Sequence, residues 1–380
     1  MTGRAACASG PELVVDVDAV ARNTRLFVAQ TEADVMAVVK ADGFGYGAAA
    51  VATTALANGA RALGVTTVDE ALALRAAGIT APILSWLNPP QADFARGLAE
   101  GVDLAIPSNV HLDAVLRAAQ VTRQSPRLHL HVDCGMARDG CEPGAWAALV
   151  ARGVRAHRAG RAQVVGVMGH LGCADHPGDP CNALGSARFA AAVAEVRRHG
   201  IDPRQLHLAA TAATLTLPTT HHTLVRIGAG LAGIDPSGTT RLRGGLTLRA
   251  PLVGVRRVEA GAAVGYGHTW RAARPTRLGL LPLGYADGLP RLASGRAEVQ
   301  VCGVRRPVVG RISMDQTVVD LGEVAARPGE VVTVFGPGDD GEPTVSDWAA
   351  WADTIPHEIV TGIGPRVRRV EAVAGLRRAG

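Results

Sequence analysis

Short apolar runs alternate with alanine-rich amphipathic segments through the first 230 or so residues, and this alternation limits the fold more than any other feature. We expect eight strands, at residues 34–39, 62–65, 83–86, 102–106, 127–132, 163–168, 206–209 and 224–227. Helices are expected between most of them, for instance at residues 68–77, 92–99, 109–118, 144–155 and 184–199. Eight strand–helix units favour an α/β fold with a closed (β/α)8 TIM barrel; an open doubly wound sheet is the alternative.

The segments on either side of this pattern differ from it. Residues 12–17 predict a further strand, and Asp18 is the expected N-cap of a helix that ends near Gln30. After about Gly233 the expected strands are separated by Gly, Pro and Asp turns, which is typical of a mostly antiparallel β domain. These strands are at residues 246–255, 277–283, 297–301, 306–309, 316–321 and 330–335, and a short helix is expected at 346–354. We place the barrel at residues 11–240 and the β domain at 241–380, with the strand at 11–17 able to join the β domain instead.

Composition argues against several classes of protein. The chain has 380 residues, of which 47% are hydrophobic and 19% charged, as expected for a globular protein of two domains. Its net charge of +5 is spread over isolated arginines without interleaved aromatic residues, which argues against nucleic-acid binding. Residues 1–10 contain no apolar core of a secretion signal, and residues 43–60 and 205–225 are too polar to span a membrane. We therefore expect a cytoplasmic protein.

The six cysteines show no CxxC spacing, so we expect reduced thiols. Residues 170–181 combine His, Cys and Asp, the residue types that bind zinc. However, prolines and glycines make this segment irregular, and no second pair of ligands follows at a standard spacing. We therefore expect no metal site.

Lys40 is the only lysine in the chain, beside 38 arginines, and it stands where the first barrel strand enters a glycine-rich turn. A guanidinium stays protonated, whereas a desolvated lysine amine loses its proton and attacks carbonyl carbons. Codon bias is the alternative explanation. A chain that uses arginine elsewhere and lysine at one strand end indicates that the amine itself has a chemical role.

The ends of the other barrel strands carry further polar groups that would share one rim with Lys40. They are Arg138, His170, Thr211, Arg226, Gly228 and Ala229. Taken singly, they could be ion-pair partners, a core histidine or a helix N-cap. Together they suit a phosphorylated aldehyde cofactor that condenses with the lysine, with its phosphate held after the seventh and eighth strands.

Motifs in both domains carry a resemblance to a known family. They are Ala37-Val-Val-Lys40-Ala-Asp-Gly-Phe-Gly-Tyr-Gly47, His131-Val-Asp-Cys-Gly-Met-Ala-Arg138, Val225-Arg226-Ile-Gly228, Val264-Gly-Tyr266-Gly-His-Thr, Leu283-Gly-Tyr285-Ala-Asp-Gly-Leu-Pro-Arg291 and Gly310-Arg-Ile-Ser-Met314-Asp315-Gln316. Over nearly its whole length the chain resembles the alanine racemases, enzymes of the pyridoxal 5'-phosphate fold-type III group. The resemblance implies a homodimeric isomerase that supplies D-alanine, a cell-wall precursor.

The resemblance also implies roles for single residues. Lys40 would bind the cofactor and act as the base on one face of the substrate α-carbon, and Tyr266 of the partner subunit would act on the other face. Arg226 would face the pyridine nitrogen and leave it unprotonated, which makes the cofactor a weaker electron sink and favours racemisation over transamination. His170 would orient Arg226.

The remaining roles concern cofactor and substrate contacts. The implied cofactor-binding set is Lys40, Phe44, His170, Thr211, Arg226, Gly228 and Ala229. The implied substrate-binding set is Arg138, Tyr285, Met314 and Asp315, of which Arg138 would lie near the substrate carboxylate and the other three would line the entrance from the partner subunit.

Four positions depart from the family's pattern. Phe44 replaces a tyrosine that meets the phosphate, and the segment around Pro365 lacks another tyrosine near the phosphate and substrate. His131 stands where many relatives have a carbamylated lysine that supports Arg138, and Ala210 replaces a polar residue. We expect these changes to loosen the pocket and to leave both bases in place.

The residues leave other functions open. The chain could be a racemase paralogue that acts on serine or a larger amino acid in specialised metabolism, or a fold-type III decarboxylase. A decarboxylase normally carries a cysteine motif and acidic residues in its second domain, whereas Cys302 is the only cysteine beyond the barrel. A non-catalytic pyridoxal-phosphate carrier is a third alternative, although such proteins are typically bare barrels.

Overall fold

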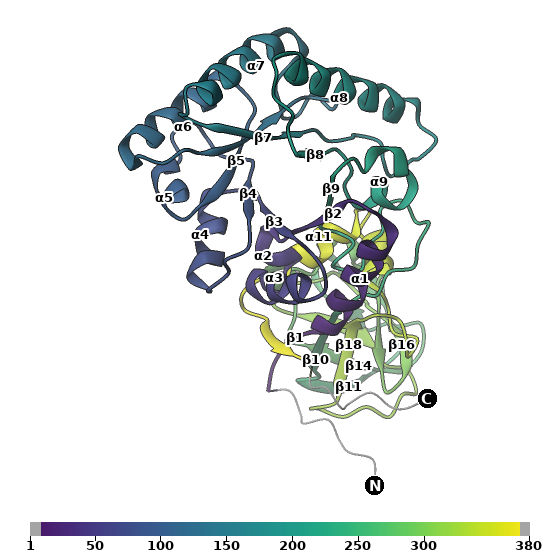
Figure 1. Ribbon diagram of the computed structural model, residues 1–380. Coiled ribbons are helices and arrows are strands. Elements are labelled where there is room, and N and C mark those ends of the chain that lie inside the picture. Colours follow the sequence, from purple (N-terminus) through teal and green to yellow (C-terminus); the bar gives the residue numbers. More distant parts are fainter. Residues whose placement is uncertain (1–8, 373–380) are drawn as a thin grey trace. The chain divides into compact units, whose positions relative to one another are not determined.

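The computed structural model describes residues 9–372 of the chain (Figure 1). These residues divide into two compact units. The barrel unit runs from Val20 to Leu242, and the β unit combines the N-terminal segment through Ala19 with the chain from Arg243 onward. The division therefore falls inside the first helix, α1 (Val17–Gln30).

The barrel unit contains eight parallel strands in the order β8-β7-β6-β5-β4-β3-β2-β9. Their bounds are β2 (Asp34–Val38), β3 (Ala62–Val65), β4 (Ile83–Ser85), β5 (Val102–Ile106), β6 (Arg127–His131), β7 (Gln163–Met168), β8 (Gln205–His207) and β9 (Leu224–Ile227). All eight lie where the sequence predicts strands, with ends that differ by at most two residues. Most of these strands are largely apolar because both faces of the sheet are covered, although β5, β6 and β8 also carry buried Asp and His side chains.

Hydrogen bonds between β8 and β9, the two strands at the ends of this order, and the residues next to them close the sheet. The Thr223 amide donates to the Leu206 carbonyl at 3.2 Å, and the Arg226 amide donates to the Ala209 carbonyl at 3.0 Å. A parallel bridge also pairs Ala210 with Arg226. The predicted (β/α)8 barrel is thereby confirmed, and the open sheet is excluded.

Helices cover the outside of these strands. Figure 1 shows α4 to α8 following one another along the outer side of β4 to β8. The helices of this unit are α2 (Lys40–Phe44), α3 (Ala48–Ala57), α4 (Val68–Ala76), α5 (Phe94–Ala99), α6 (Asn109–Thr122), α7 (Pro143–Arg158), α8 (Pro180–Arg198), α9 (Thr211–Thr216) and the 3-10 turn η1 (Pro218–Thr220). In α7 the buried side chains Trp146, Leu149, Val150 and Val154 follow helical spacing, which explains why this face packs inward.

Helix α1 begins one residue before the predicted cap. The Asp16 carboxylate, and not Asp18, accepts the amide hydrogen bond that starts the helix, at 3.0 Å from the Asp18 nitrogen. The prediction of Asp18 as N-cap is wrong because two aspartates lie close together and the earlier one satisfies the free amide.

The glycine-rich turn after β2 is left-handed. Ala41, Asp42, Gly43 and Phe44 have φ values of 52°, 53°, 61° and 60°. Three of these residues have a Cβ atom, for which this conformation is unfavourable. Side chains hold the turn: Glu70 accepts from the Ala41 amide at 2.9 Å, and Asp42 accepts from the Ala48 amide at 2.8 Å, at the start of α3.

The β unit contains three sheets, with strand orders β16-β15-β18-β10-β1-β19, β11-β14-β17 and β12-β13. The strands are β1 (Glu12–Val15), β10 (Leu246–Pro251), β11 (Gly254–Val258), β12 (Ala263–Val264), β13 (Trp270–Arg271), β14 (Thr276–Leu281), β15 (Glu298–Val301), β16 (Val304–Pro307), β17 (Thr317–Asp320), β18 (Val331–Phe335) and β19 (Arg368–Glu371). The helices are α10 (Val345–Trp351), α11 (Pro356–Thr361), η2 (Tyr266–His268), η3 (Tyr285–Asp287) and η4 (Arg291–Ala293). Every named pair is antiparallel except β1 with β19.

Residues 246–255, predicted as one strand, form two strands in different sheets. The Leu252 amide donates to the Glu330 carbonyl at 2.9 Å, beside β18, and the next amide, of Val253, donates to Leu280 in β14 at 2.9 Å. The chain therefore changes sheets between adjacent residues, and an unbroken apolar run gives no sign of this change.

The first and last described strands are neighbours in one sheet. Strand β1 pairs antiparallel with β10 and parallel with β19. Glu12 in β1 is 4% exposed, and its carboxylate binds Arg249 at 2.8 Å and also pairs with Arg368. Within residues 9–372, no helix is both long and apolar enough to cross a membrane.

Candidate active site

Lys40 follows β2 and comes directly before the left-handed turn. Its side chain is partly buried, and this desolvation, together with the positive charge of Arg138, lowers the pKa of the Lys40 amine. Glu70 opposes the shift as an anion. A lowered pKa increases the fraction of neutral amine, the form that attacks an aldehyde.

Arg226 in β9 is 4% exposed, and five acceptors surround its terminal nitrogens, among them the Leu208 carbonyl at 3.3 Å from Nη2. Nη1 donates to the His207 carbonyl at 2.7 Å and lies 3.1 Å from His207 Nδ1. Nη2 donates to the Gly169 carbonyl at 2.7 Å and lies 3.1 Å from His170 Nδ1. Burial lowers the pKa of Arg226 to about 10, which keeps the guanidinium charged at neutral pH.

His170 is the side chain that the sequence pairs with Arg226, and the structure places the two in contact. Burial, with Arg226 as the second cause, lowers the pKa of His170 to about 3. The imidazole is therefore neutral near pH 7, and its Nδ1 can accept from the guanidinium.

Thr211, Gly228 and Ala229 are buried at the ends of neighbouring barrel strands. The Gly230 amide donates to Thr211 Oγ1 at 3.1 Å, which leaves the hydroxyl hydrogen for another acceptor. A Cβ at Gly228 would lie 3.0 Å from the ring of Phe44, so glycine allows Phe44 to pack against the strand end. The cofactor-binding residues predicted around the phosphate thus lie next to one another.

Arg138 lies in the loop after β6, and its side chain is exposed. Asp133 shapes this loop by accepting the amides of Gly135, Met136 and Ala137 at 2.8, 3.0 and 3.2 Å. Within residues 9–372, no hydrogen bond or ion pair holds the Arg138 guanidinium. Its charge is therefore available to an anionic ligand.

His131 is buried, and its imidazole lies close to the carboxylate of Asp139. Its Nδ1 is 3.6 Å from the Asp139 carboxylate and has no hydrogen-bond partner among the described residues. Burial lowers the pKa of His131 to about 4, although Asp139 acts in the opposite direction. His131 is therefore neutral near pH 7. It does not supply the negative charge that a carbamylated lysine would have at this position.

The remaining predicted residues belong to the β unit. Tyr266 begins η2 with 70% of its surface exposed, after Gly265 with a φ of 68°. The Tyr285 amide donates to the Ser313 carbonyl at 3.0 Å, which brings Tyr285 beside Met314; both side chains are exposed. Asp315 forms an ion pair with Arg366 at 2.8 Å. Tyr285, Met314 and Asp315 therefore lie close to one another in this unit.

The sequence did not single out Glu70 and His207 as site residues. Glu70 binds the backbone after Lys40, and His207 contacts Arg226. His207 lies at the end of β8, as the rim residues do, so its position was a usable signal. Glu70 is in α4 and gave none, because its contact with the turn depends on the packing of the helix.

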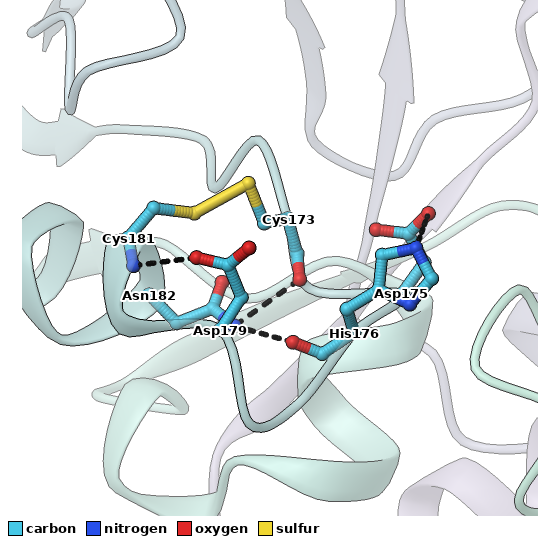
Figure 2. The surroundings of a disulfide bond; sticks show 6 residues. All are labelled: Cys173, Asp175, His176, Asp179, Cys181 and Asn182. Atoms are coloured by element: carbon cyan, nitrogen blue, oxygen red, sulfur yellow. Dashed lines mark hydrogen bonds and ion pairs between the residues drawn. A yellow bond between two sulfur atoms is a disulfide. The ribbon is translucent and has the colours of Figure 1, made fainter.

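The prediction of reduced cysteines throughout is wrong. Cys173 and Cys181 form a disulfide in the loop between β7 and α8 (Figure 2). Around it, the Asn182 side-chain amide donates to the carbonyls of Cys173 at 3.1 Å and His176 at 3.0 Å, and Asp179 accepts from the Cys181 amide at 2.8 Å. This hydrogen-bonding brings the two sulfurs together, which an irregular sequence does not reveal.

Three side chains of this loop are candidate metal ligands. The potential ligand atoms of Cys173, Asp179 and Cys181 lie within 4.8 Å of one another. A metal would need both thiolates, which are joined to each other in this state. The disulfide and a metal ion are therefore mutually exclusive here.

Comparison with known proteins identifies the family. The models of the alanine racemase N-terminal domain and of the alanine racemase C-terminal domain match residues 15–236 and 245–371. Alanine racemase of Thermobifida fusca is 45% identical over 363 residues, which cover 94% of this chain and 97% of that protein.

Solved structures agree with this match. The alanine racemase of D-cycloserine-producing Streptomyces lavendulae has a TM-score of 0.94 and 42% identity, and the match covers 96% of this chain and 97% of that chain. The alanine racemase of Bartonella henselae, solved with covalently bound pyridoxal phosphate, has a TM-score of 0.86 and 26% identity, with 96% and 100% covered. The chain belongs to the alanine racemase family.

Proposed function

We propose that this protein is a pyridoxal 5'-phosphate-dependent isomerase that interconverts L- and D-alanine, with Lys40 and Tyr266 as its two acid–base groups. The observation that carries the proposal is the single lysine of the chain, with a lowered pKa, at the end of a barrel strand in an alanine racemase family member. When bound, the cofactor supplies the electron sink that acidifies the substrate α-carbon.

The barrel residues fit the phosphorylated aldehyde. Lys40 offers an amine with a lowered pKa for the aldehyde carbon, and Thr211 offers a hydroxyl hydrogen for the phosphate. The backbone of Gly228 and Ala229 would complete the phosphate site, with the Phe44 ring packed beside it. Because Phe44 has no hydroxyl, one donor is absent, a change worth about 1–3 kcal/mol where water does not replace it.

Arg226 fits the role of a fixed donor toward the pyridine nitrogen. Its four Nη hydrogens have acceptors in His207, Leu208, Gly169 and His170, so Nε–H is the donor that remains for a ligand. A group that keeps its own proton leaves the pyridine nitrogen without one. We propose His170 as the group that orients Arg226, in keeping with the 3.1 Å contact.

Arg138 would bind the substrate carboxylate, because its exposed guanidinium has no partner among residues 9–372. Tyr266 would exchange the proton on the opposite face of the α-carbon. A tyrosine that is 70% exposed is available to a second copy of the chain, which supports a homodimer with shared sites. Tyr285, Met314 and Asp315 would line the entrance from that same partner.

The proposed cellular role follows from the product. A D-alanine-forming enzyme would supply a cell-wall precursor and would act in the cytoplasm on free amino acid. The comparisons do not favour a decarboxylase. We therefore place alanine before serine or larger amino acids as the substrate.

The proposal is tested by trapping the cofactor and by following the α-hydrogen. Borohydride reduction of the holoenzyme should leave a pyridoxyl group on Lys40 in a peptide map. In heavy water, both enantiomers of alanine should gain α-deuterium. Tyr266→Phe should lower kcat by about 10²–10⁴-fold and should restrict exchange to one enantiomer.

Tyr46→Phe is the matched control, because the Tyr46 hydroxyl donates to the Ala232 carbonyl at 2.8 Å inside the barrel unit. It should exchange both enantiomers. The racemase assignment is wrong if a panel of amino acids gains no α-deuterium, and release of carbon dioxide from the panel would indicate a decarboxylase instead.

A further inference from the structure

A line of buried polar side chains crosses the interior of the barrel unit and ends on Arg226. Asp103 comes from β5, His129 from β6 and His207 from β8. Asp103 is 5% exposed, and both histidines are 0% exposed. Polar groups this deeply buried are costly unless each finds a partner, so their order needs a physical explanation.

Each neighbour in the line is within contact distance of the next. Arg226 Nη1 lies 3.1 Å from His207 Nδ1, and His207 Nε2 lies 2.8 Å from His129 Nδ1. His129 Nε2 lies 3.4 Å from Asp103 Oδ2. At the far end, Arg127 Nε donates to Asp103 Oδ1 at 2.9 Å.

Arg226 and Asp103, at the two ends of the line, determine which ring nitrogen of each histidine carries the hydrogen. A guanidinium only donates, so His207 Nδ1 must accept, and the neutral His207 then has its hydrogen on Nε2. That hydrogen points to His129 Nδ1, so the hydrogen of His129 is on Nε2 and points to the Asp103 carboxylate, which only accepts. A single set of tautomers satisfies all three contacts.

Gly166 in β7 makes the central contact sterically possible. Strand β7 lies between β6 and β8, and a Cβ at Gly166 would be 2.5 Å from His129 Nδ1. The same Cβ would be 2.7 Å from the Gln205 carbonyl oxygen. The φ of Gly166 is not in the left-handed region, so close approach, and not backbone conformation, requires glycine here.

We propose that Asp103 and His129 are positioning residues, which keep His207 as a hydrogen-bond acceptor and thereby fix the Arg226 guanidinium for catalysis. This inference rests on the proposed function of Arg226 as the donor to the cofactor. The carboxylate selects the tautomer two side chains away, without touching the cofactor or the substrate.

The substitution Asp103→Asn should reverse the direction of the hydrogen bonds along the line, while the side chain keeps nearly the same shape. Arg127 Nε lies nearer to Asp103 Oδ1, at 2.9 Å, than to Oδ2, at 3.2 Å, so it favours the amide oxygen of the asparagine at the Oδ1 position. The NH2 group then faces His129 Nε2, and both histidines must move their hydrogen to Nδ1. An N–H of His207 would consequently face an N–H of Arg226, and that contact would be lost.

Arg127→Gln is the matched control. It removes the other half of the same ion pair, whose arginine side chain is 44% exposed, and it leaves the acceptor carboxylate beside His129. We expect the tautomers of both histidines to stay as in the parent protein.

The tautomers can be read directly. Long-range 1H–15N correlation spectra of holoenzyme labelled with 15N-histidine should show Nε2–H for His129 and His207, assigned by signals lost in His129→Gln. Asp103→Asn should show Nδ1–H for the same residues. A parent spectrum with Nδ1–H on either histidine overturns the proposal, whether or not any variant folds.

Kinetics separate positioning from structural support. Asp103→Asn should lower kcat for alanine by about 10- to 100-fold with KM within about twofold, a size typical of residues that orient a functional group. Arg127→Gln should keep both constants within about twofold. Equal kcat losses in the two variants would overturn the proposal. A parent holoenzyme with the expected protons and no racemisation would overturn the proposed function while supporting the proton order.

Discussion

At the scale of single residues, His131 combines burial with an incomplete set of hydrogen bonds. Its Nδ1 has no hydrogen-bond partner within residues 9–372, and the Asp139 carboxylate is 3.6 Å away. Desolvation outweighs the attraction of Asp139, so the folded protein holds the imidazole neutral with a pKa of about 4. In the unfolded chain a histidine titrates near 6.5.

His131 therefore makes stability depend on pH in a defined window. Between about pH 4 and 6.5 the unfolded chain binds the proton and the folded protein does not, so stability is complete above this window and falls as the pH drops through it. Lowering the pH from 7 to 4.5 should cost roughly 2–3 kcal/mol through this residue. Urea unfolding at the two pH values measures the loss.

His131→Gln should lose less stability over the same interval because it cannot titrate. The matched control is His176→Gln, which replaces an imidazole with 80% of its side chain exposed and should retain the parent's pH dependence. Identical pH dependence in His131→Gln and the parent would contradict the assignment.

Residue-level prediction was most specific where chemistry made a residue rare. Lys40 could be singled out because arginine cannot replace its amine. His207 was overlooked because a histidine in an apolar run looks like core, and only the distance to Arg226 gives it a role. Contacts between distant strands depend on ring orientation, which sequence does not specify.

At the scale of elements, the β7–α8 loop combines a cross-link with a site residue. The loop starts next to His170, which contacts Arg226, and the disulfide joins residues 173 and 181 across it. Asp179 and Asn182 fix the start of α8 at the other end of the loop. The disulfide thus restricts the conformations of a segment that begins at the candidate site.

Reducing this disulfide should lower the free energy of unfolding by about 2–3 kcal/mol, the chain-entropy value for a loop of this length. Denaturant titrations with and without reductant measure the effect, and Cys173→Ser should be insensitive to reductant. Cys302→Ser, at an exposed free thiol, should respond to reductant as the parent does. If all six cysteines react with a thiol reagent in denaturant alone, the cross-link is absent.

Element positions followed from sequence because period and length agree in the barrel. Apolar runs of three to six residues between amphipathic helices gave all eight strands. The hairpin β12–β13 and helix α11 were not predicted, since two-residue strands and a six-residue helix are too short to show a period. The left-handed turn after Lys40 was predicted only as a turn, because its handedness depends on the Glu70 and Asp42 contacts.

At the scale of the whole molecule, both ends of the described chain contribute to one unit. Strand β1 lies between β10 and β19, and among residues 9–372 the β19 strand has no other partner in this sheet. The carboxylate of Glu12 binds one arginine on each neighbouring strand, Arg249 and Arg368. Sequence predicted the strand and allowed it to join the β domain, but the parallel pairing with β19 needs contacts between distant segments.

Glu12→Gln should therefore weaken the β unit, because a neutral amide cannot accept from two guanidiniums as a carboxylate does. The expected loss is about 1–3 kcal/mol in the free energy of unfolding. Glu371→Gln is the control, at an exposed position at the end of β19, and should change stability by less than about 0.5 kcal/mol. Equal effects of the two substitutions, measured by urea unfolding, would contradict this account.

The central place of β1 in its sheet has a consequence for biosynthesis. This strand leaves the ribosome about 230 residues before β10 and about 350 residues before β19. At roughly 5–20 residues per second, it waits about 10–50 s for its first neighbour and about 20–70 s for its second. The nascent chain must therefore keep an exposed strand edge from mispairing while the entire barrel is translated, and the sheet is completed only when β19 has emerged.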